Sequence, residues 1–172
     1  MIISLAGYMG SGKSHISKLL SEKLNFKLID LDKEIIKKNN HTIAEIFKNR
    51  GEIYFRKQER EFLEEVLATE NNAVLSLGGG TPAYYNNMDV INQNSFSFHL
   101  RANVGTLSER LKKQKAKRPL IANIPDEDLP EFIAKHLFER NPFYNKAQFT
   151  ISTDNKDPEE IVDEIIRHLP IR

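Results

Sequence analysis

Short apolar runs alternate along the chain with segments in which apolar residues recur every three or four positions. The short runs predict five β-strands, at residues 2–6, 26–29, 73–77, 96–100 and 149–152. The periodic segments predict helices at residues 13–24, 31–38, 42–48, 52–69, 104–113, 129–140 and 158–169. Such alternation favours a parallel sheet with helices on both faces. We therefore expect an α/β fold of three layers, with a central, mostly five-stranded parallel sheet between two helical layers.

A polar segment at residues 116–130 interrupts this alternation and contains Pro119, Pro125 and Pro130. It is longer than most connections in compact domains, and segments of this kind often form lids over a binding site. We expect a mobile lid at about residues 114–130 within a single domain that spans residues 1–172.

The balance of charge excludes some function classes. Lys and Arg total 25 and Asp and Glu total 24, whereas nucleic-acid binders normally carry a strong basic excess. The chain has no cysteine, which excludes a disulfide framework, a thiolate zinc site and a cysteine nucleophile, and suits a reducing compartment. The apolar start at residues 2–6 lacks a cationic leader and is too short to span a bilayer. We expect a cytoplasmic monomer without nucleic-acid or membrane partners.

Residues 7–14, Gly-Tyr-Met-Gly-Ser-Gly-Lys-Ser, match the phosphate-binding pattern G-x-x-x-x-G-K-[ST] between a predicted strand and a predicted helix. The backbone N–H groups of such a loop and the positive end of its helix bind phosphates. We expect Lys13 to bridge the outer phosphates and Ser14 to ligate Mg²⁺. The expected nucleotide contacts in this loop are Gly10, Ser11, Gly12, Lys13 and Ser14. A signalling GTPase is excluded, because residues 155–158 read Asn-Lys-Asp-Pro where guanine recognition needs N-K-x-D.

Asp30 and Asp32 follow the second predicted strand, so they are expected at the edge of the sheet where the nucleotide binds. Alternate residues of an extended segment point to opposite sides, so one carboxylate can face Mg²⁺ and the other an acceptor hydroxyl. Phosphoryl transfer uses both functions. The alternative is that an aspartate caps the helix that begins here.

Arginines and glycines suggest how an acceptor is held. Arg56 and Glu59 share a helix face, and an ordinary solvated salt bridge is the simpler explanation of that pair. Gly78–Gly80 require either a sharp turn or a close approach of the backbone to another group. Arg118, in the expected lid, can neutralise charge that develops during transfer. Together with Arg140, these groups suit a small substrate that bears a carboxylate.

The motifs together resemble the shikimate kinase family in order and spacing across almost the whole chain. They are residues 7–14, Asp30 with Asp32, residues 51–56 with Glu59, residues 75–80, residues 118–120, and Arg140 with Tyr144. The resemblance implies a P-loop kinase fold and transfer of the γ-phosphoryl group of MgATP to the 3-hydroxyl of shikimate. The products would be shikimate 3-phosphate and ADP, on the route to chorismate and the aromatic amino acids.

The resemblance also implies roles for individual residues. The catalytic groups would be Lys13, which stabilises the transferring phosphoryl, Asp32, which acts as the base, and Arg118. Ser14 would hold Mg²⁺, with Asp30 assisting through water. Asp32, Arg56, Arg140 and the Gly79 backbone would hold the substrate, within a helical segment at about residues 31–62. Arg110 and Arg118 would contact the nucleotide, Arg110 lying against adenine, and residues 153–158 would form the adenine loop.

Two positions depart from the family pattern. His15 follows Ser14 where the family usually has a small hydroxyl residue, and Leu31 replaces a common threonine. We interpret His15 as a surface residue that borders the nucleotide and can alter its affinity. Two other functions remain open at this point: a related small-molecule kinase, for example one that acts on gluconate, and a nucleotide-binding module without chemistry.

Overall fold

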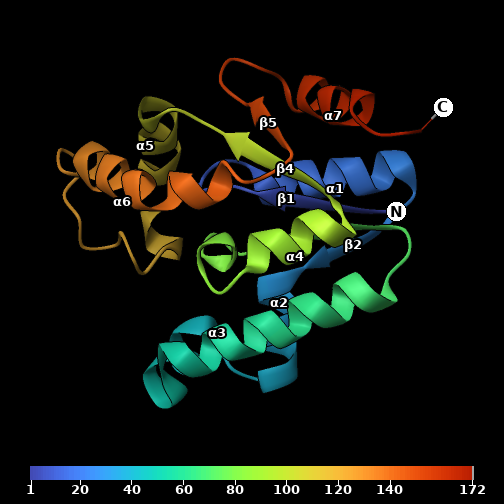
Figure 1. Ribbon diagram of the computed structural model, residues 1–172. Coiled ribbons are helices and arrows are strands. Elements are labelled where there is room, and N and C mark those ends of the chain that lie inside the picture. The colour runs from blue at the N-terminus through green and yellow to red at the C-terminus, as the bar shows by residue number, and fades with distance from the viewer. Residues whose placement is uncertain (172) are drawn as a thin grey trace.

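The computed structural model describes residues 1–171 and contains one five-stranded sheet in the order β2-β3-β1-β4-β5 (Figure 1). Every pair of neighbouring strands is parallel, which confirms the predicted sheet. The strands are β1 (Ile2–Ala6), β2 (Lys27–Asp30), β3 (Ala73–Ser76), β4 (Phe96–Arg101) and β5 (Phe149–Ser152).

Helices cover both faces of the sheet, so the predicted three layers are confirmed (Figure 1). Residues of β1 alternate between the two cores, with Ile2 and Ala6 in one and Ile3 and Leu5 in the other. One core is closed by α1 (Lys13–Leu24) and α7 (Pro158–Arg167). The other core is closed by α2 (Leu31–Asn39), α3 (Ile43–Thr69), α4 (Asn87–Asn94), α5 (Val104–Lys112) and α6 (Leu129–Tyr144).

The two helices predicted at residues 42–48 and 52–69 are confirmed as the two parts of α3, which Gly51 separates with a non-helical φ of 84° that only glycine adopts readily. Two other elements differ from the sequence prediction. Helix α4 was not predicted, because its polar sequence buries only Asn87, Met88 and Ile91. Helix α6 continues past Arg140 to Tyr144, although it contains Pro142. Proline normally disrupts a helix because it has no N–H; here the carbonyl that Pro142 leaves without a helical donor belongs to the exposed Phe138, where water can replace the lost bond.

The strand order brings three chain segments together at one edge of the sheet. β2, β3 and β1 are neighbours, with Asp30 in register with Ser76, and Ser76 in register with Leu5. The residues that directly follow these strands therefore meet above the same edge. They are the loop Gly7–Gly12, the start of α2, and Gly78–Gly80, which precede a short 3₁₀-helix at Thr81–Ala83.

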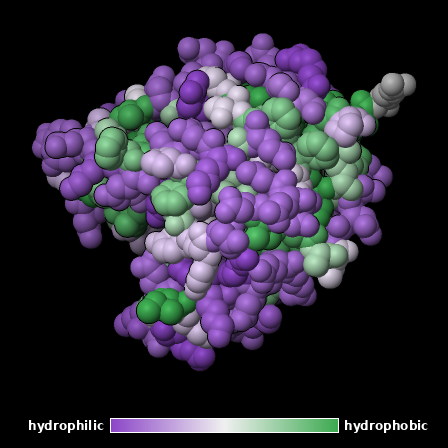
Figure 2. All heavy atoms as spheres, viewed as in Figure 1, coloured by the Kyte–Doolittle hydropathy of each residue, from purple (hydrophilic) through white to green (hydrophobic). Residues whose placement is uncertain are grey.

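The surface facing the viewer in Figure 2 is largely hydrophilic, with apolar residues in small separate patches. Ile53 and Phe138 are the most exposed large apolar side chains of the described residues, at 85% and 83%. Within residues 1–171, none of the helices combines the length and apolar character that crossing a bilayer requires.

Candidate active site

The loop between β1 and α1 forms a cradle around the Lys13 side chain. Gly10 and Gly12 have φ of 80° and 91°, a left-handed backbone that glycine adopts without strain. The Lys13 ammonium donates to the Gly7 carbonyl at 2.5 Å and to the Tyr8 carbonyl at 3.4 Å. Burial lowers the pKa of Lys13 to about 8, and the nearby Asp32 carboxylate opposes that shift.

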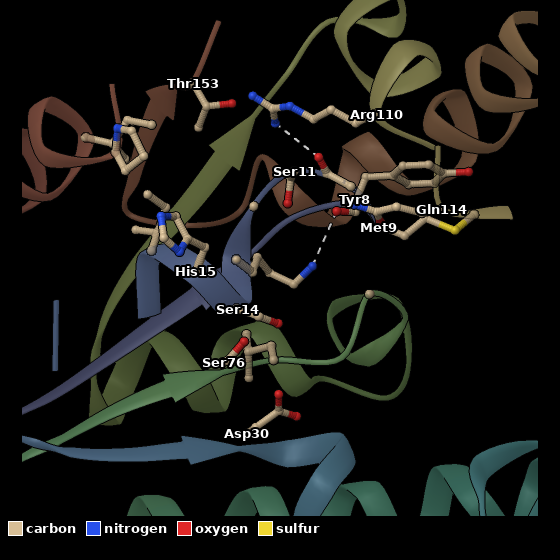
Figure 3. A pocket seen from close by; sticks show the side chains of 18 of the residues that line it. Tyr8, Met9, Ser11, Ser14, His15, Asp30, Ser76, Arg110, Gln114 and Thr153 are labelled. Carbon is tan, nitrogen blue, oxygen red and sulfur yellow. Dashed lines mark hydrogen bonds between the residues drawn. The ribbon is translucent and has the colours of Figure 1, made fainter. Parts of the chain in front are cut away.

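A crevice of about 510 Å³ opens beside this loop (Figure 3). The predicted nucleotide, metal and catalytic residues all line it: Gly10, Ser11, Gly12, Lys13, Ser14, His15, Asp30, Asp32, Arg110 and Arg118. Gly79 lines the same crevice. Ser76, from the motif at residues 75–80, lines it as well, and sequence reasoning gave no site role to three further lining residues, Ile16, Gln114 and Ile161.

The two aspartates lie at the start of α2 rather than along an extended strand. Asp30 ends β2 and caps α2, accepting the Lys33 N–H at 3.2 Å, and Asp32 lies in the first helical turn. The predicted alternation along a strand is therefore wrong, and the helix-cap alternative is correct. Both residues nonetheless line the crevice, and the Asp30 carboxylate points toward Ser76 and Ser14 in Figure 3.

Asp32 lies in a negatively charged environment. Burial raises the pKa of its carboxyl to about 6, and the neighbouring Glu59 and Asp30 carboxylates add to the shift, while Lys13 and Arg56 oppose it. A β-carbon placed on Gly78 would lie only 2.8 Å from Asp32 Oδ1 and 3.2 Å from Glu59 Oε2. Gly78 therefore provides the space in which these two acidic side chains approach the loop.

Arg56 and Glu59 form a buried pair. Arg56 Nη1 donates to Glu59 Oε1 at 3.0 Å, and the Thr81 hydroxyl donates to Glu59 Oε2 at 2.8 Å. Glu59 is 1% exposed, so the solvated salt bridge favoured by its sequence neighbourhood is wrong. Burial raises the pKa of Glu59, and the Arg56 guanidinium opposes that shift. The pair holds the Arg56 guanidinium in a fixed orientation.

The guanidinium groups of Arg56 and Arg140 meet at the glycine loop. A β-carbon on Gly80 would lie 2.7 Å from Arg56 Nη1 and Nη2 and 2.9 Å from Arg140 Nη1. The Arg56 guanidinium also stacks 3.8 Å above the Tyr84 ring. Arg140 does not line the 510 Å³ crevice, and Arg56 lines a second pocket with Glu52, Ile53, Tyr84 and Tyr85. The arginines lie against Gly80, and the neighbouring Gly79 lines the crevice, so the two arginines border the crevice at these glycines.

The segment predicted as a lid rests partly on the core. It contains a short 3₁₀-helix at Lys115–Lys117, and Ile121 is fully buried. Lys115 bonds to the Ile124 carbonyl and pairs with Asp126. Arg118 Nη2 donates to Gln114 Oε1 at 3.3 Å, and its side chain lines the crevice.

The far end of the crevice is formed by α5 and the loop before α7. Arg110 Nη1 donates to the Gly10 carbonyl at 3.0 Å, as Figure 3 shows, and so attaches α5 to the phosphate-binding loop. Thr153, Lys156 and Pro158 line the crevice from the segment compared above with an adenine loop. His15 is exposed and lines the crevice, in agreement with its interpretation as a surface residue beside the nucleotide.

The oxygen donors of the crevice fit a magnesium ion. Ser14, Asp30 and Asp32 supply a hydroxyl and two carboxylates, the hard ligands that Mg²⁺ prefers. Residues 1–171 contain no cluster of three or more His, Cys, Asp or Glu side chains that could enclose a metal. Mg²⁺ usually keeps several waters and binds one or two carboxylates together with phosphates, so this sparse donor set suits it.

Comparison with known proteins gives one consistent family. The shikimate kinase family model matches residues 9–170. A shikimate kinase of Flavobacterium johnsoniae is 47% identical over 95% of this chain and 96% of its own length. The crystal structure of shikimate kinase from Bacteroides thetaiotaomicron has a TM-score of 0.92 at 36% identity and covers 99% of both chains. The Acinetobacter baumannii enzyme in complex with shikimate has a TM-score of 0.85 at 30% identity, covering 96% of this chain and 90% of its own.

The raised pKa of Asp32 predicts a pH-dependent effect of Asp32→Asn on stability. Because the folded-state pKa, about 6, exceeds the 3.8 of an exposed aspartate, the folded protein binds more protons than the unfolded chain between these pH values. The charged carboxylate therefore lowers stability as the pH rises through this window. Asp32→Asn should raise the free energy of unfolding by on the order of 2 kcal/mol at pH 7.5, and by almost nothing at pH 4.

Urea unfolding at the two pH values measures this difference. Asp89→Asn, at an exposed aspartate on α4, serves as the matched control and should give no comparable gain. A gain from Asp32→Asn of equal size at pH 4 and pH 7.5 would contradict the electrostatic origin.

Proposed function

The chain belongs to the shikimate kinase family, whose members are ATP-dependent kinases, and we propose how its own residues carry out that activity. In this proposal the γ-phosphoryl group of MgATP passes to the 3-hydroxyl of shikimate, giving shikimate 3-phosphate and ADP. The observation that carries the proposal is the meeting of Lys13, Asp32 and Gly79 in one crevice, with the guanidinium groups of Arg56 and Arg140 gathered at the adjacent Gly80.

ATP binds along the loop of residues 7–14, with its base toward Arg110 and residues 153–158. The Lys13 ammonium, which donates to the Gly7 carbonyl, turns to the more strongly accepting phosphate oxygens and stabilises the transferring group. Arg118 adds a second positive charge from the lid when that segment closes. Both cations act at the oxygens on which charge develops during transfer.

Ser14 and Asp30 would hold Mg²⁺, Asp30 through water as the family resemblance implies. The ion, when bound, neutralises phosphate charge. One Asp30 oxygen already accepts the Lys33 N–H at the helix cap, so its carboxylate has limited freedom to rotate. The cap thereby orients the group that faces the metal.

Asp32 accepts the proton of the 3-hydroxyl as that oxygen attacks the γ-phosphorus. A general base is most effective when its pKa is near the operating pH, and burial beside Glu59 moves the pKa of Asp32 to about 6. Arg56 and Arg140 bind the carboxylate of shikimate, because guanidinium groups match carboxylate geometry. The Gly79 backbone, which lines the crevice, completes the acceptor site.

The enzyme acts as a monomer in the cytoplasm in this proposal. Every residue assigned to the site comes from one chain, both substrates are small metabolites, and a chain without cysteine suits a reducing compartment.

An acceptor screen tests the proposed function. ADP release is measured with MgATP and either shikimate or gluconate, and we expect turnover with shikimate alone. Turnover with gluconate and none with shikimate would support the related-kinase alternative. ATP binding without turnover on any acceptor would reduce the protein to a nucleotide-binding module, although such a module would need neither Asp32 nor Arg118.

Asp32→Asn should separate binding from chemistry. The amide keeps the size of the side chain but cannot accept the proton, so kcat should fall by about 10²- to 10⁴-fold. The Kd of ATP, measured by calorimetry, should stay within about twofold, because the cradle around Lys13 is untouched. An unchanged kcat would remove Asp32 from the role of base.

Arg56→Ala should weaken shikimate binding selectively. Loss of a charged hydrogen-bonding partner should raise the KM for shikimate by at least about tenfold and leave the KM for ATP nearly unchanged. Arg50→Ala, at an exposed arginine of the same helix, provides the matched control. The assignment fails if the wild-type enzyme binds a shikimate analogue without the carboxylate as tightly as shikimate.

A further inference from the structure

The carbonyl oxygen of Gly79 is held by two donors from one helix. The Tyr144 hydroxyl donates to it at 2.6 Å and Arg140 Nη1 donates at 2.9 Å, across 65 and 61 residues of sequence. Arg140 and Tyr144 are one turn apart on α6 and therefore lie on the same face of the helix. The end of α6 is thus attached directly to the glycine loop that lines the crevice.

The hydrogen bonds from Arg140 and Tyr144 restrain the backbone of Gly78–Gly80, whose residues have no side chains that could hold it in place. Glycine has the largest conformational freedom of any residue, and Gly78–Gly80 follow one another. Because a peptide unit is planar, any rotation that moves the Gly79 carbonyl also moves the N–H of Gly80. Two hydrogen bonds on one oxygen therefore fix the whole peptide unit between Gly79 and Gly80.

The Tyr144 side chain is placed so that it reaches substrate only through this peptide. Tyr144 is 1% exposed, it does not line the crevice, and its ring packs at 5.1 Å from that of the buried His99. Burial raises the pKa of the Tyr144 hydroxyl to about 12, so the hydroxyl keeps its proton and remains a donor. Packing on one side, and on the other the hydrogen bond to the Gly79 carbonyl beside the Arg140 guanidinium, define its orientation.

We propose that Tyr144 is a positioning residue for the acceptor: its hydroxyl holds the peptide between Gly79 and Gly80 in the orientation that binds shikimate. Arg140 shares this task through one N–H group and keeps the others for the substrate carboxylate. The inference rests on the proposed function, in which the Gly79 backbone and Arg140 bind the acceptor. It gives the R-x-x-x-Y spacing at the end of α6 a physical reason, since residues four apart on a helix share a face and here reach the same carbonyl.

Tyr144→Phe removes the hydroxyl and keeps the ring that packs on His99. We expect the Kd and KM of shikimate to rise about three- to tenfold, the range expected for loss of one hydrogen bond. The KM of ATP and kcat should stay within about twofold, because neither the phosphate cradle nor Asp32 is altered. A variant that was only less stable would not show this selective change.

Tyr54→Phe is the matched control. Its hydroxyl donates to Asn39 Oδ1 at 3.1 Å, and neither residue lines the crevice. It also removes one tyrosine hydroxyl from a partly buried hydrogen bond, and it should leave the Kd of shikimate unchanged. An equal rise in both variants would overturn the proposal.

The positioning role has a second readout that needs no substrate. In the free protein, the backbone amide of Gly80 should show greater mobility by ¹⁵N relaxation in Tyr144→Phe than in the wild type. An unchanged Gly80 amide, or an unchanged Kd of shikimate, would overturn the positioning role. A wild-type protein that does not phosphorylate shikimate would instead overturn the proposed function, so the two failures are distinguishable.

Discussion

The parallel strand order β2-β3-β1 is the constraint on which the site depends. Parallel neighbours end at the same edge of a sheet, so three segments that are far apart in the sequence must meet there. The segment after β1 provides the Lys13 ammonium, the segment after β2 provides Asp30 and Asp32, and the segment after β3 provides the glycines at residues 78–80. A different strand order would keep every motif and separate the lysine from the aspartates.

Three acidic side chains, Glu59, Asp30 and Asp32, lie near this edge of the sheet and differ in the partners that compensate their charge. Glu59 is neutralised by Arg56 and accepts a hydrogen bond from Thr81. Asp30 accepts a backbone N–H at the cap of α2. Within residues 1–171, Asp32 has neither kind of direct partner, and its carboxyl is the one whose pKa rises to about 6. Burial raises the pKa of Glu59 as well, but its oxygens are held by Arg56 and Thr81, so in the proposed transfer Asp32 is the carboxylate that takes up the proton.

Local motifs were predictable from the sequence, whereas tertiary contacts were not. The phosphate-binding loop fixes its own geometry through glycines and a helix start, so α1 was predicted at its observed bounds. The helix at residues 31–38 was predicted, but the argument that set Asp30 and Asp32 on opposite sides assumed an extended segment, whereas the cap formed by Asp30 places Asp32 in the first helical turn. The meeting of Arg56 with Arg140 depends on tertiary packing, because α3 and α6 both contact the 3₁₀-helix at Thr81–Ala83 that follows the glycines. The contact of Tyr144 was missed because Pro142 predicts an end to the helix, although the four-residue spacing from Arg140 was a usable signal.

Helix α6 lies between the segment that carries Arg118, at its start, and the glycine loop of the acceptor site, at its end. Its first turn follows the segment that carries Arg118, and its last turns carry the two donors to Gly79. Leu129 and Ile133 are fully buried, so the helix is anchored in the core from its first residue. Ile121, in the segment that carries Arg118, is also fully buried, so a movement of Arg118 that keeps Ile121 and Leu129 in place would leave α6 where it is. In the proposed mechanism the acceptor end then stays preorganised while Arg118 closes over the nucleotide, which keeps the acceptor aligned with an incoming phosphoryl group.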